Sequence, residues 1–490
     1  MQPASNTGGL HAVAIIGAGF AGLCMAIKLK AAGIDDFVIL ERGDRVGGTW
    51  RDNTYPGCAC DVPSHLYSYS FATNGEWSRV FAPWHEIRDY IEGCVERFGL
   101  APHLRFGAEV SELRFDDADQ CWRLHLAGGG LLRARVVVSG TGPLNKPETP
   151  ELPGLARFGG RVFHSSHWDH DYDLRGKRVA VIGTGASAIQ IVPSIAPQVA
   201  RLHLFQRTAP WVMPRFDRAY AGWERGLLRA LPAWRWLVRQ AVYWRLELFG
   251  WALLKDGRAR RMFETLGRWH LRRQVSDPAL RAKLTPDYRL GCKRVLLSDD
   301  YYPSLQRPNV EVVTEAVTEI TAHGVRSADG TERAVDVIVF ATGFKATEFL
   351  TPMRIYNARD EELSARWRHG AASYLGIEVA GFPNLFLLVG PNTGLGHNSI
   401  VFMIEAQVHY VIECLKALRA RGTRSAEVKA AAQAAYDDEV QRRLQGTAWL
   451  AGCRSWYLSA DGRNFTMWPG FTVEYWRRTR RFDPALHDFR

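Results

Sequence analysis

The stretch AVAIIGAGFAG, from Ala12 to Gly22, is the part of the sequence that decides the fold. Its first five residues, AVAII, are typical of a buried parallel strand. Gly17, Gly19 and Gly22 follow in a G-x-G-x-x-G pattern, and LCMAIKLKAAG then has helical apolar spacing. A strand, a glycine turn and a helix in this order let backbone amides and the positive end of the helix approach a pyrophosphate. The stretch therefore predicts a dinucleotide-binding Rossmann-like fold.

A second strand supports this interpretation. FVIL ends in Glu41, which lies 24 residues after Gly17. In a dinucleotide-binding fold, a carboxylate at this place accepts a hydrogen bond from the ribose 2′-hydroxyl of the adenosine. We expect Phe20, in the glycine turn, to contact the same ligand.

The sequence then repeats the pattern. RVAVIGTGASA, from Arg178 to Ala188, is another strand and glycine turn, in which Ala188 takes the place of the third glycine. We expect this turn to bind a second dinucleotide through Gly183, Thr184, Gly185, Ala186 and Ser187.

The residue at the ribose position differs between the two folds. The strand RLHLF leads to Arg207 and Thr208, and Arg207 lies 24 residues after Gly183, as Glu41 does after Gly17. Glutamate repels a 2′-phosphate, whereas arginine offers it a planar fork of donors. Charge-assisted bonds of this kind contribute about 1.5–3 kcal/mol each. The first fold is therefore expected to bind FAD and the second NADPH, so that electrons pass from nicotinamide to flavin.

Composition is that of a globular protein of several domains. The chain has 490 residues, of which 47% are hydrophobic and 23% charged, and this length exceeds one compact core. We find no run of eighteen uncharged apolar residues, and the N-terminal sequence lacks the basic start and apolar stretch of a signal peptide. Eight cysteines are scattered without a CxxC pair. These features predict a cytoplasmic protein in a reducing compartment.

The expected fold class is α/β, with two Rossmann-like domains and a helical insertion in the second. The buried stretches 135–142 (RVVVSGTG) and 336–343 (DVIVFATG) bracket the second fold, and the proline-rich stretch 143–154 is an expected linker. We expect helices over 399–421 and 426–445. The predicted division is a first FAD-binding part at 1–147, an NADPH-binding domain at 148–335 with its insertion at about 213–275, and a second FAD-binding part with C-terminal helices at 336–490.

The excess positive charge lies in the predicted insertion. Between Arg215 and Arg273 there are fourteen Lys or Arg against five Asp or Glu, which accounts for +9 of the net +11, together with six tryptophans. Three interpretations stay open: a cap over the pocket, packing helices without a further role, and a membrane-surface helix, of which the last is least favoured. No nucleic-acid-binding fold accompanies the charge. The oligomeric state stays open.

Two further stretches carry a resemblance to a known family. GGTWRDNTYPGCACD, at 47–61, resembles the long signature of type I Baeyer–Villiger monooxygenases, which are class B flavoprotein monooxygenases. Its matching residues are Gly48, Trp50, Tyr55, Pro56, Gly57 and Asp61. FGGRVFHSSHWD matches the shorter fingerprint of the same family through Phe158, Gly160, His164, Trp168 and Asp169. Flavin-containing monooxygenases are similar, but typically carry Tyr or Phe and then Lys or Arg in place of Trp168 and Asp169.

The fingerprint decides how its histidines are interpreted. His164, His167 and His170 recur every three residues among aspartates, a spacing that invites a metal site. Because His164 belongs to the fingerprint and the other two fall between its positions, we expect no metal. His164 is interpreted as a residue of the domain linker that couples the two cofactors.

The resemblance also implies a mechanism. Reduced flavin would take up O₂ as a C4a-peroxide that attacks a ketone carbonyl, and Arg294 would be the mobile arginine that stabilises this anion. Asp61 would hold Arg294 by a hydrogen bond, and Lys293 would turn toward the NADPH 2′-phosphate. The alternative is that Lys293 and Arg294 are an exposed basic pair without a role.

Other positions of the family carry over with smaller roles. Thr49, Trp50 and Tyr67 resemble flavin-domain contacts, and Val110 an adenine neighbour. The stretch 390–400 resembles the loop near the isoalloxazine ring, with Ile400 closest, and Trp456 matches a contact of the nicotinamide ribose. After Trp456, LSADGRNFTMWPG departs from the loop of cyclohexanone-type members.

The expected function is therefore an FAD- and NADPH-dependent monooxygenase that converts a small ketone to an ester or lactone with O₂. The alternatives are oxygenation at sulfur or nitrogen, and an NADPH oxidase or NADPH-sensing flavoprotein without an organic substrate. The sequence does not identify the ketone.

Overall fold

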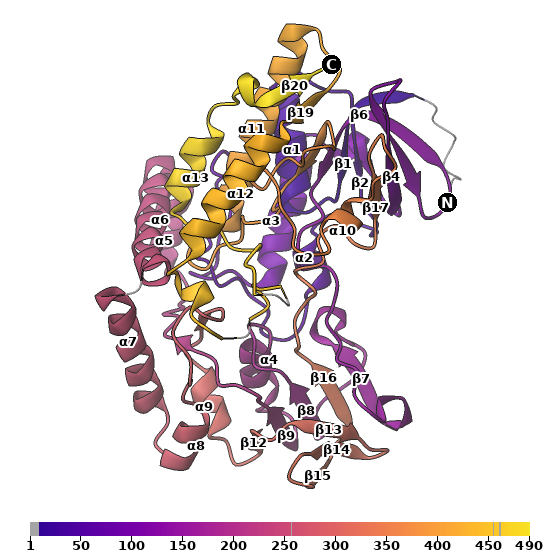
Figure 1. The fold of residues 1–490 in the computed structure, drawn as a ribbon. Helices are drawn as coiled ribbons and strands as arrows, with labels where there is room; N and C mark the ends of the chain where they lie inside the picture. Colours follow the sequence, from indigo (N-terminus) through magenta and orange to yellow (C-terminus); the bar gives the residue numbers. More distant parts are fainter. Residues whose placement is uncertain (1–8, 256, 454, 460–461) are drawn as a thin grey trace.

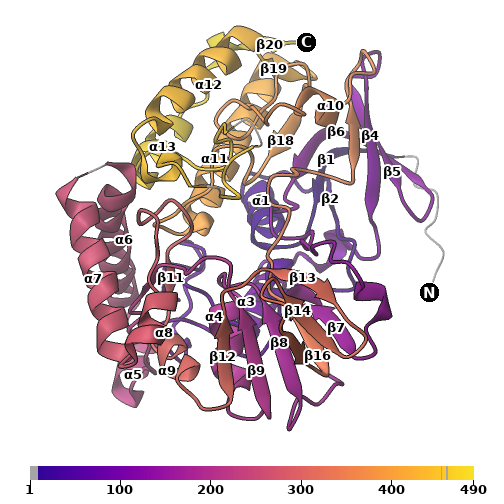
Figure 2. The same cartoon turned by 60° about the horizontal axis from the view of Figure 1, so that its bottom comes forward.

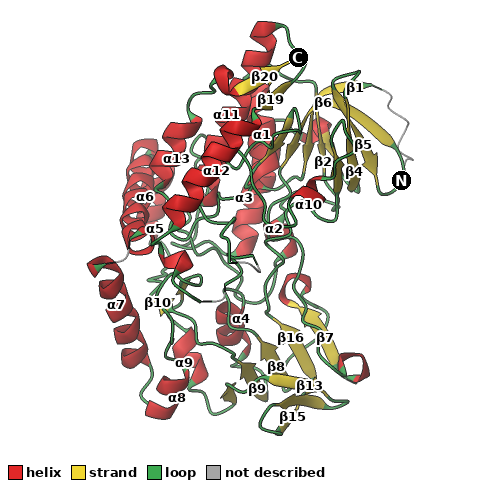
Figure 3. Ribbon diagram, viewed as in Figure 1, coloured by secondary structure: helices red, strands yellow, loops and turns green. Residues whose placement is uncertain are grey.

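A computed structural model describes residues 9–255, 257–453, 455–459 and 462–490 (Figure 1). It contains two main sheets, each combined with helices (Figure 3). The larger has eight strands, in the order β17-β4-β5-β6-β1-β2-β3 with β18 beside β6. Their bounds are β1 (Leu10–Ile16), β2 (Phe37–Leu40), β3 (Leu104–Arg105), β4 (Val110–Asp116), β5 (Cys121–Leu126), β6 (Leu131–Ser139), β17 (Arg354–Tyr356) and β18 (Leu385–Leu387).

The centre of this sheet is the predicted first fold. β1 lies parallel to both β2 and β6, and Gly17 follows its carboxyl end with a φ of +98° that glycine adopts without strain. A Cβ on Gly22 would lie 1.9 Å from the carbonyl oxygen of Gly17. Gly22 therefore permits α1 (Phe20–Ala31) to pack closely on the turn. The face of α1 that turns from the sheet packs on α11 (Ile400–Arg421), close to its predicted bounds.

The second sheet has five parallel strands in the order β12-β9-β8-β16-β7. β8 and β9 begin and end where the sequence predicts, and the glycine turn after β8 leads into α4 (Ala188–Ile195). We expected the chain to return to the flavin part at residue 336, and this boundary is wrong. β16 pairs with β7 and β8, so the return follows Phe340. The bounds are β7 (Arg161–His164), β8 (Arg178–Ile182), β9 (Arg201–Phe205), β12 (Val310–Val313) and β16 (Val337–Phe340).

The chain passes between the two sheets twice, and the two connecting segments are hydrogen-bonded to each other. The amide of Lys345 donates to the carbonyl of Lys146 at 2.9 Å, and the amide of Glu148 donates to the carbonyl of Gly343 at 2.9 Å. Pro147 and Phe344 form an antiparallel bridge between these contacts. The predicted proline-rich linker is thus one strand of a two-stranded ribbon.

The predicted insertion is helical. It consists of α5 (Gly222–Ala230), α6 (Pro232–Leu254) and α7 (Arg258–Gln274), and α8 (Pro278–Lys283) follows it. α6 and α7 pack side by side along one edge of the molecule (Figure 2). None of the helices in the described ranges is long and apolar enough to cross a membrane.

The C-terminal region differs from the prediction at one point. Residues 426–428 form β19 (Ala426–Val428), which pairs with β20 (His487–Phe489), and the helix α12 begins only afterwards (Ala430–Leu444). The chain also forms the following helices and strands: α2 (Thr49–Asp52), α3 (Trp84–Arg97), β10 (Val212–Met213), β11 (Leu296–Leu297), α9 (Tyr301–Leu305), β13 (Val317–Ile320), β14 (Gly324–Ser327), β15 (Glu332–Ala334), α10 (Leu363–Arg366) and α13 (Thr472–Thr479).

The long signature packs against the second sheet's helix α4. The Tyr55 hydroxyl donates to Oε1 of Gln190 at 2.9 Å, and Nε2 of Gln190 donates to the carbonyl of Ala59 at 2.9 Å. Gly57 has a φ of +81°, and a Cβ there would lie 2.3 Å from Oγ of Ser194. This part of the signature therefore holds the two sheets together.

A substitution at Gly57 tests this contact. Gly57→Ala should lower the melting temperature, because positive φ and the clash with α4 together cost about 1–3 kcal/mol. Gly226→Ala is the matched control, because a Cβ there meets nothing within 4 Å inside α5 and should stabilise the helix by about 0.5–1 kcal/mol. Thermal unfolding followed by circular dichroism measures both. Equal melting temperatures for the two variants would contradict the assignment.

Candidate active site

Both glycine turns open on one cavity of about 1230 Å³ between the sheets. This volume exceeds the roughly 300–1,000 Å³ of an ordinary ligand pocket. Gly17, Gly19 and Phe20 line one end, and the predicted residues 183–187 line the other. Two dinucleotides bound at these turns would therefore meet in a shared space. Gly22 is an exception among the predicted ligand-binding residues, because it packs α1 on the turn and does not line the cavity.

The Glu41 carboxylate is buried and held in a fixed position at the first end. One oxygen accepts from the amide of Ala18 at 2.9 Å, and the other accepts from the amide of Gly43 at 2.8 Å and from the guanidinium of Arg51 at 2.7 Å. Glu41 and Arg51 both line the cavity. The sequence interpretation missed Arg51, which stands within the long signature, ten positions after Glu41 and beyond the loop that precedes α2.

The first turn fits the pyrophosphate of FAD. A Cβ on Gly19 would lie 3.7 Å from Cα of Gly48, so the two glycines leave a cradle that side chains would fill. The first turn of α1 contains no acidic residue, which leaves its positive end open to an anion. Nε1 of Trp50 donates to the Tyr67 hydroxyl at 3.2 Å. The other predicted flavin contacts all line the cavity: Thr49, Trp50, Asp61, Tyr67, Val110 and Ile400.

The second turn fits a phosphorylated dinucleotide. A Cβ on Gly183 would lie 2.4 Å from the carbonyl oxygen of Ala341, so the turn requires glycine. Burial lowers the pKa of Lys293, and the neighbouring Arg207 lowers it further. Two cations that face each other beside an open cavity are a suitable site for a phosphate dianion. Thr208 lines the cavity beside them, and its carbonyl accepts from the Thr184 hydroxyl at 3.2 Å.

The expected bond between Arg294 and Asp61 is present. The guanidinium donates to the carboxylate in an ion pair, and both side chains face the cavity, with 41% and 29% of their surfaces accessible. Burial opposes the ionisation of Asp61, but Arg294 outweighs it and holds the pKa of the carboxyl below its usual range. Asp61 in turn raises the pKa of Arg294. Arg294 is therefore a permanent cation that faces the cavity.

The fingerprint lies outside the cavity. It forms β7 at the edge of the second sheet, where a Cβ on Gly160 would lie 2.3 Å from the carbonyl oxygen of Asp336. Burial lowers the pKa of His164 to about 4, so the ring is neutral at neutral pH, and it packs at 5.7 Å from the ring of Phe344 in the connecting ribbon. Phe158, Trp168 and Asp169 lie next to this strand in the sequence, and none of the three lines the cavity.

The other two histidines make ordinary polar contacts. Nδ1 of His167 lies 3.0 Å from the Ser166 hydroxyl, and Nε2 of His170 lies 2.7 Å from the hydroxyl of Thr54 in the long signature. His170 thus adds a contact between the fingerprint and the signature.

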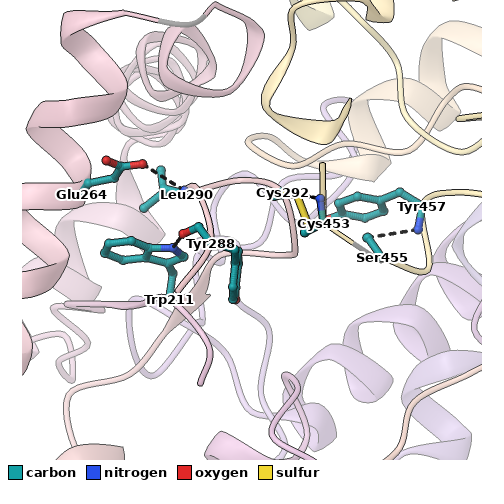
Figure 4. Close-up of a disulfide and its surroundings, with 8 residues drawn as sticks. All are labelled: Trp211, Glu264, Tyr288, Leu290, Cys292, Cys453, Ser455 and Tyr457. Carbon is teal, nitrogen blue, oxygen red and sulfur yellow. Dashed lines mark hydrogen bonds between the residues drawn. A yellow bond between two sulfur atoms is a disulfide. The ribbon is translucent and has the colours of Figure 1, made fainter. Parts of the chain in front are cut away.

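A disulfide joins Cys292 to Cys453, which are separated by 161 residues (Figure 4). The sequence interpretation predicted a reducing compartment and did not find this pair, because neither cysteine has a neighbour at a recognisable spacing. The bond fixes the segment that carries Lys293 and Arg294 to the segment before Trp456, and all three side chains line the cavity. The six other cysteines are free and buried.

The insertion does not line the cavity. None of its residues in the described ranges contributes to the lining, although Glu247 of α6 accepts from the side chain of Asn398, a lining residue, at 2.6 Å. The interpretation as a cap therefore stays a prediction. The wall near the expected isoalloxazine position instead comes from the stretch 390–400 and from Thr466 and Met467. The last two lie in the stretch that departs from cyclohexanone-type members, part of which, 460–461, lies outside the described residues.

Two dinucleotide folds that open on one cavity, with Arg207 and Lys293 beside the second turn, are the arrangement of a flavoprotein oxidoreductase that takes electrons from NADPH. The family model for pyridine nucleotide-disulphide oxidoreductases matches residues 14–222. The chain is 52% identical over 475 residues to a Baeyer–Villiger monooxygenase of Streptomyces coelicolor, which covers 96% of this chain and 91% of the relative. It is 48% identical over 479 residues to one of Pseudomonas aeruginosa, with 97% and 90% covered.

Solved structures agree with these relatives. OTEMO in complex with FAD and NADP superposes with a TM-score of 0.89 at 28% identity, over 98% of this chain and 99% of that one. Oxidised steroid monooxygenase bound to NADP superposes with a TM-score of 0.86 at 30% identity, over 98% and 99%. The chain belongs to the family of Baeyer–Villiger monooxygenases, and it is an FAD- and NADPH-dependent enzyme.

The coenzyme preference can be tested at Arg207. Arg207→Glu should weaken NADPH binding by about 2–4 kcal/mol, because charge-assisted bonds are replaced by repulsion, and should leave NADH binding nearly unchanged. Arg307→Glu is the control, because this exposed arginine does not line the cavity. Titration of each coenzyme, followed by flavin fluorescence, gives the dissociation constants. Equal losses for NADPH and NADH would show that Arg207 does not contact the 2′-phosphate.

The disulfide can be tested by counting thiols. Protein purified without reductant and then denatured should react with a thiol reagent at six cysteines, and after reduction at eight. Cys292→Ser should raise the count without reductant by one, because Cys453 is released, whereas Cys121→Ser should lower it by one. Eight reactive thiols in the unreduced wild type would disprove the bond.

Proposed function

We propose that this enzyme oxidises a small ketone to an ester or lactone. One ketone, NADPH, a proton and O₂ give one ester, NADP⁺ and water, so that one oxygen atom enters a carbon–carbon bond beside the carbonyl. The observation that carries the proposal is the single cavity on which both glycine turns open, with the Arg294–Asp61 pair between them. The caprolactone-bound cyclohexanone monooxygenase among its structural neighbours supports a ketone as the substrate class.

Different residues would bind the two cofactors at the two ends of the cavity. Gly17, Gly19 and Glu41 would hold the pyrophosphate and ribose of FAD, whereas Arg207, Thr208 and Lys293 would hold the 2′-phosphate of NADPH. Trp456 would lie against the nicotinamide ribose. When it is bound and reduced, the flavin supplies the electrons that activate dioxygen.

Arg294 would act directly on the reaction. Negative charge develops on oxygen as the carbonyl carbon is attacked, and a fixed cation in a site of low dielectric constant is an effective way to stabilise it. Asp61 is a positioning residue, because its carboxylate orients the guanidinium and does not itself meet the substrate. The largely buried stretch 390–400 and Met467 would exclude water from the same space.

The domain division follows the sheets. We propose an FAD-binding domain made of residues 1–147 and the part after Phe340, and an NADPH-binding domain between them. The fingerprint packs on the ribbon between the domains, which supports His164 as a residue that couples their movement. A cytoplasmic location stays part of the proposal. In the cytoplasm, the Cys292–Cys453 bond would be in exchange with reducing thiols.

A coupling measurement tests the function itself. Adding an accepted ketone should raise NADPH consumption and lower the release of hydrogen peroxide, and mass spectrometry should show a product heavier than the ketone by one oxygen atom. A panel of linear, cyclic, aromatic and steroid ketones with sulfides and amines as comparison would identify the substrate class. Peroxide release that no ketone lowers would indicate an NADPH oxidase, and oxygenation of sulfides or amines alone would indicate a heteroatom oxygenase.

Substitutions at the adjacent residues 293 and 294 separate the two half-reactions. Arg294→Ala should keep FAD bound and reducible by NADPH, but lower ester formation by about 10²–10³-fold, because the developing anion loses its cation. Lys293→Ala is the matched neighbour, and should raise the NADPH concentration required while product formation at saturation is largely kept. Asp61→Ala should resemble Arg294→Ala more mildly. Stopped-flow flavin absorbance and product analysis measure both steps, and ester formation at the wild-type rate by Arg294→Ala would refute the role.

A further inference from the structure

The outer side of α6 carries an apolar stripe that the described chain leaves uncovered. Its residues recur at alternating intervals of three and four, so they share one side of the helix. Large side chains there are between 42% and 67% exposed, whereas a soluble monomer seldom gathers such residues into one patch. The stripe consists of Trp234, Leu237, Ala241, Trp244, Leu248 and Trp251.

Two charged residues of α6, Arg239 and Glu247, point the other way. Arg239 is 6% exposed and donates to the carbonyls of His65 and Ser68, at 2.8 and 2.9 Å. Glu247 is 3% exposed, and its carboxylate accepts from the Thr472 amide at 3.2 Å and from the Asn398 amide group at 2.6 Å. The helix thus buries charges against the flavin domain and exposes tryptophans. This orientation is the reverse of an ordinary surface helix, so the outer side is suited to an apolar partner.

Basic residues lie beside the stripe. On α7, exposed Arg258, Arg261 and Arg272 share one side with Met262 and Trp269, which are 61% and 48% exposed. Among the described residues, no carboxylate pairs with any of these three arginines. Lys255 lies over the Trp251 ring at 5.3 Å, and Arg273 over the Trp269 ring at 5.2 Å.

The acidic residues of the insertion do not neutralise this surface. Within its described part, Glu224 pairs with Arg218 at 2.7 Å, Glu247 is buried, and Glu264 lies toward Arg260 and the Leu290 amide. The outer side of α6 and α7 is therefore both aromatic and positively charged. Indole rings beside Arg and Lys are the combination found where a helix lies at the headgroup level of a bilayer.

We propose that the outer side of α6 and α7 docks on an anionic lipid surface. The surface complements the charge, and its acyl boundary accommodates the stripe. A second copy of the chain fits less well, because a two-fold contact would bring two copies of the same positively charged surface together. The proposal is independent of the reaction, although the inner side of α6 reaches the stretch 390–400, where a Cβ on Gly250 would lie 2.9 Å from the His397 ring. In a docked enzyme, α6 alone would therefore separate the cavity wall from apolar ketones that are dissolved in the lipid.

Vesicle sedimentation of the FAD-loaded enzyme tests the proposal without using its activity. The enzyme should bind vesicles of equal parts phosphatidylglycerol and phosphatidylcholine, and bind far less to phosphatidylcholine alone. The triple substitution Arg258→Gln, Arg261→Gln and Arg272→Gln should weaken binding by about 100-fold, since each basic residue near an anionic surface contributes about fivefold. Raising the salt from 0.1 to 1 M, which shortens the screening length from about 10 to about 3 Å, should do the same.

Two further variants separate charge from apolar contact. Trp244→Gln, Leu248→Gln and Trp251→Gln together should abolish binding at any salt concentration. The control Arg359→Gln, Arg368→Gln and Arg424→Gln removes equal charge from exposed sites on the flavin domain, and should keep binding within about threefold because the removed charges lie away from the docking surface. FAD content and melting temperature confirm that each variant is folded, and the exposed arginines of α7 can be replaced without disturbing the core.

The alternatives give different results. A wild type that stays in solution with phosphatidylglycerol vesicles, or that binds equally after either substitution on α6 or α7, overturns the proposal. So does a control that loses as much binding as the α7 variant, because net charge alone would then be responsible. Sedimentation velocity that shows a dimer, dissociated by the α6 substitutions, would assign the stripe to a second copy and overturn it as well.

Discussion

The ion pair between Asp61 and Arg294 is the contact on which the site depends. Asp61 ends the long signature of the flavin part, whereas Arg294 lies in the NADPH part. The ion pair therefore joins the two parts of the chain at the wall of the cavity. Removing one partner would leave the other as an uncompensated charge in a partly desolvated space. Gln190 of α4 holds the same signature through its hydrogen bonds with Tyr55 and Ala59. The position of Arg294 in the cavity and the cohesion between the two parts are therefore maintained by one short segment.

The sequence predicts well what is local. β8 and β9 are placed without error, and the equal spacing of Glu41 and Arg207 from their glycine turns brings both to the cavity. Prediction from the sequence fails where contacts join distant segments. The strand β16 has the same buried pattern whichever sheet it enters, and no local pattern indicates that Cys292 and Cys453 are paired. The Arg51 contact with Glu41 was also missed, because a side chain that returns across a loop leaves no periodicity.

The insertion illustrates the limit of composition. Its charge and tryptophan content are evident from the sequence, but three interpretations stayed open because composition does not say which side of a helix is buried. Arg239 and Glu247 settle this orientation, since a buried charge must find partners and theirs belong to the flavin domain. Those partners fix the rotation of α6, and the tryptophans are outside as a consequence.

The hydrogen-bonded ribbon between the two parts has a consequence for synthesis of the chain on the ribosome. The NADPH part is enclosed by the ribbon, and its last strand, β16, ends at Phe340. The flavin sheet still lacks β17 and β18 at that point, and α11, which packs on α1, begins only at Ile400. Because domains fold as their residues emerge, the second nucleotide-binding part is complete first. Flavin can be captured only after most of the chain has been translated, onto a partner that is already folded.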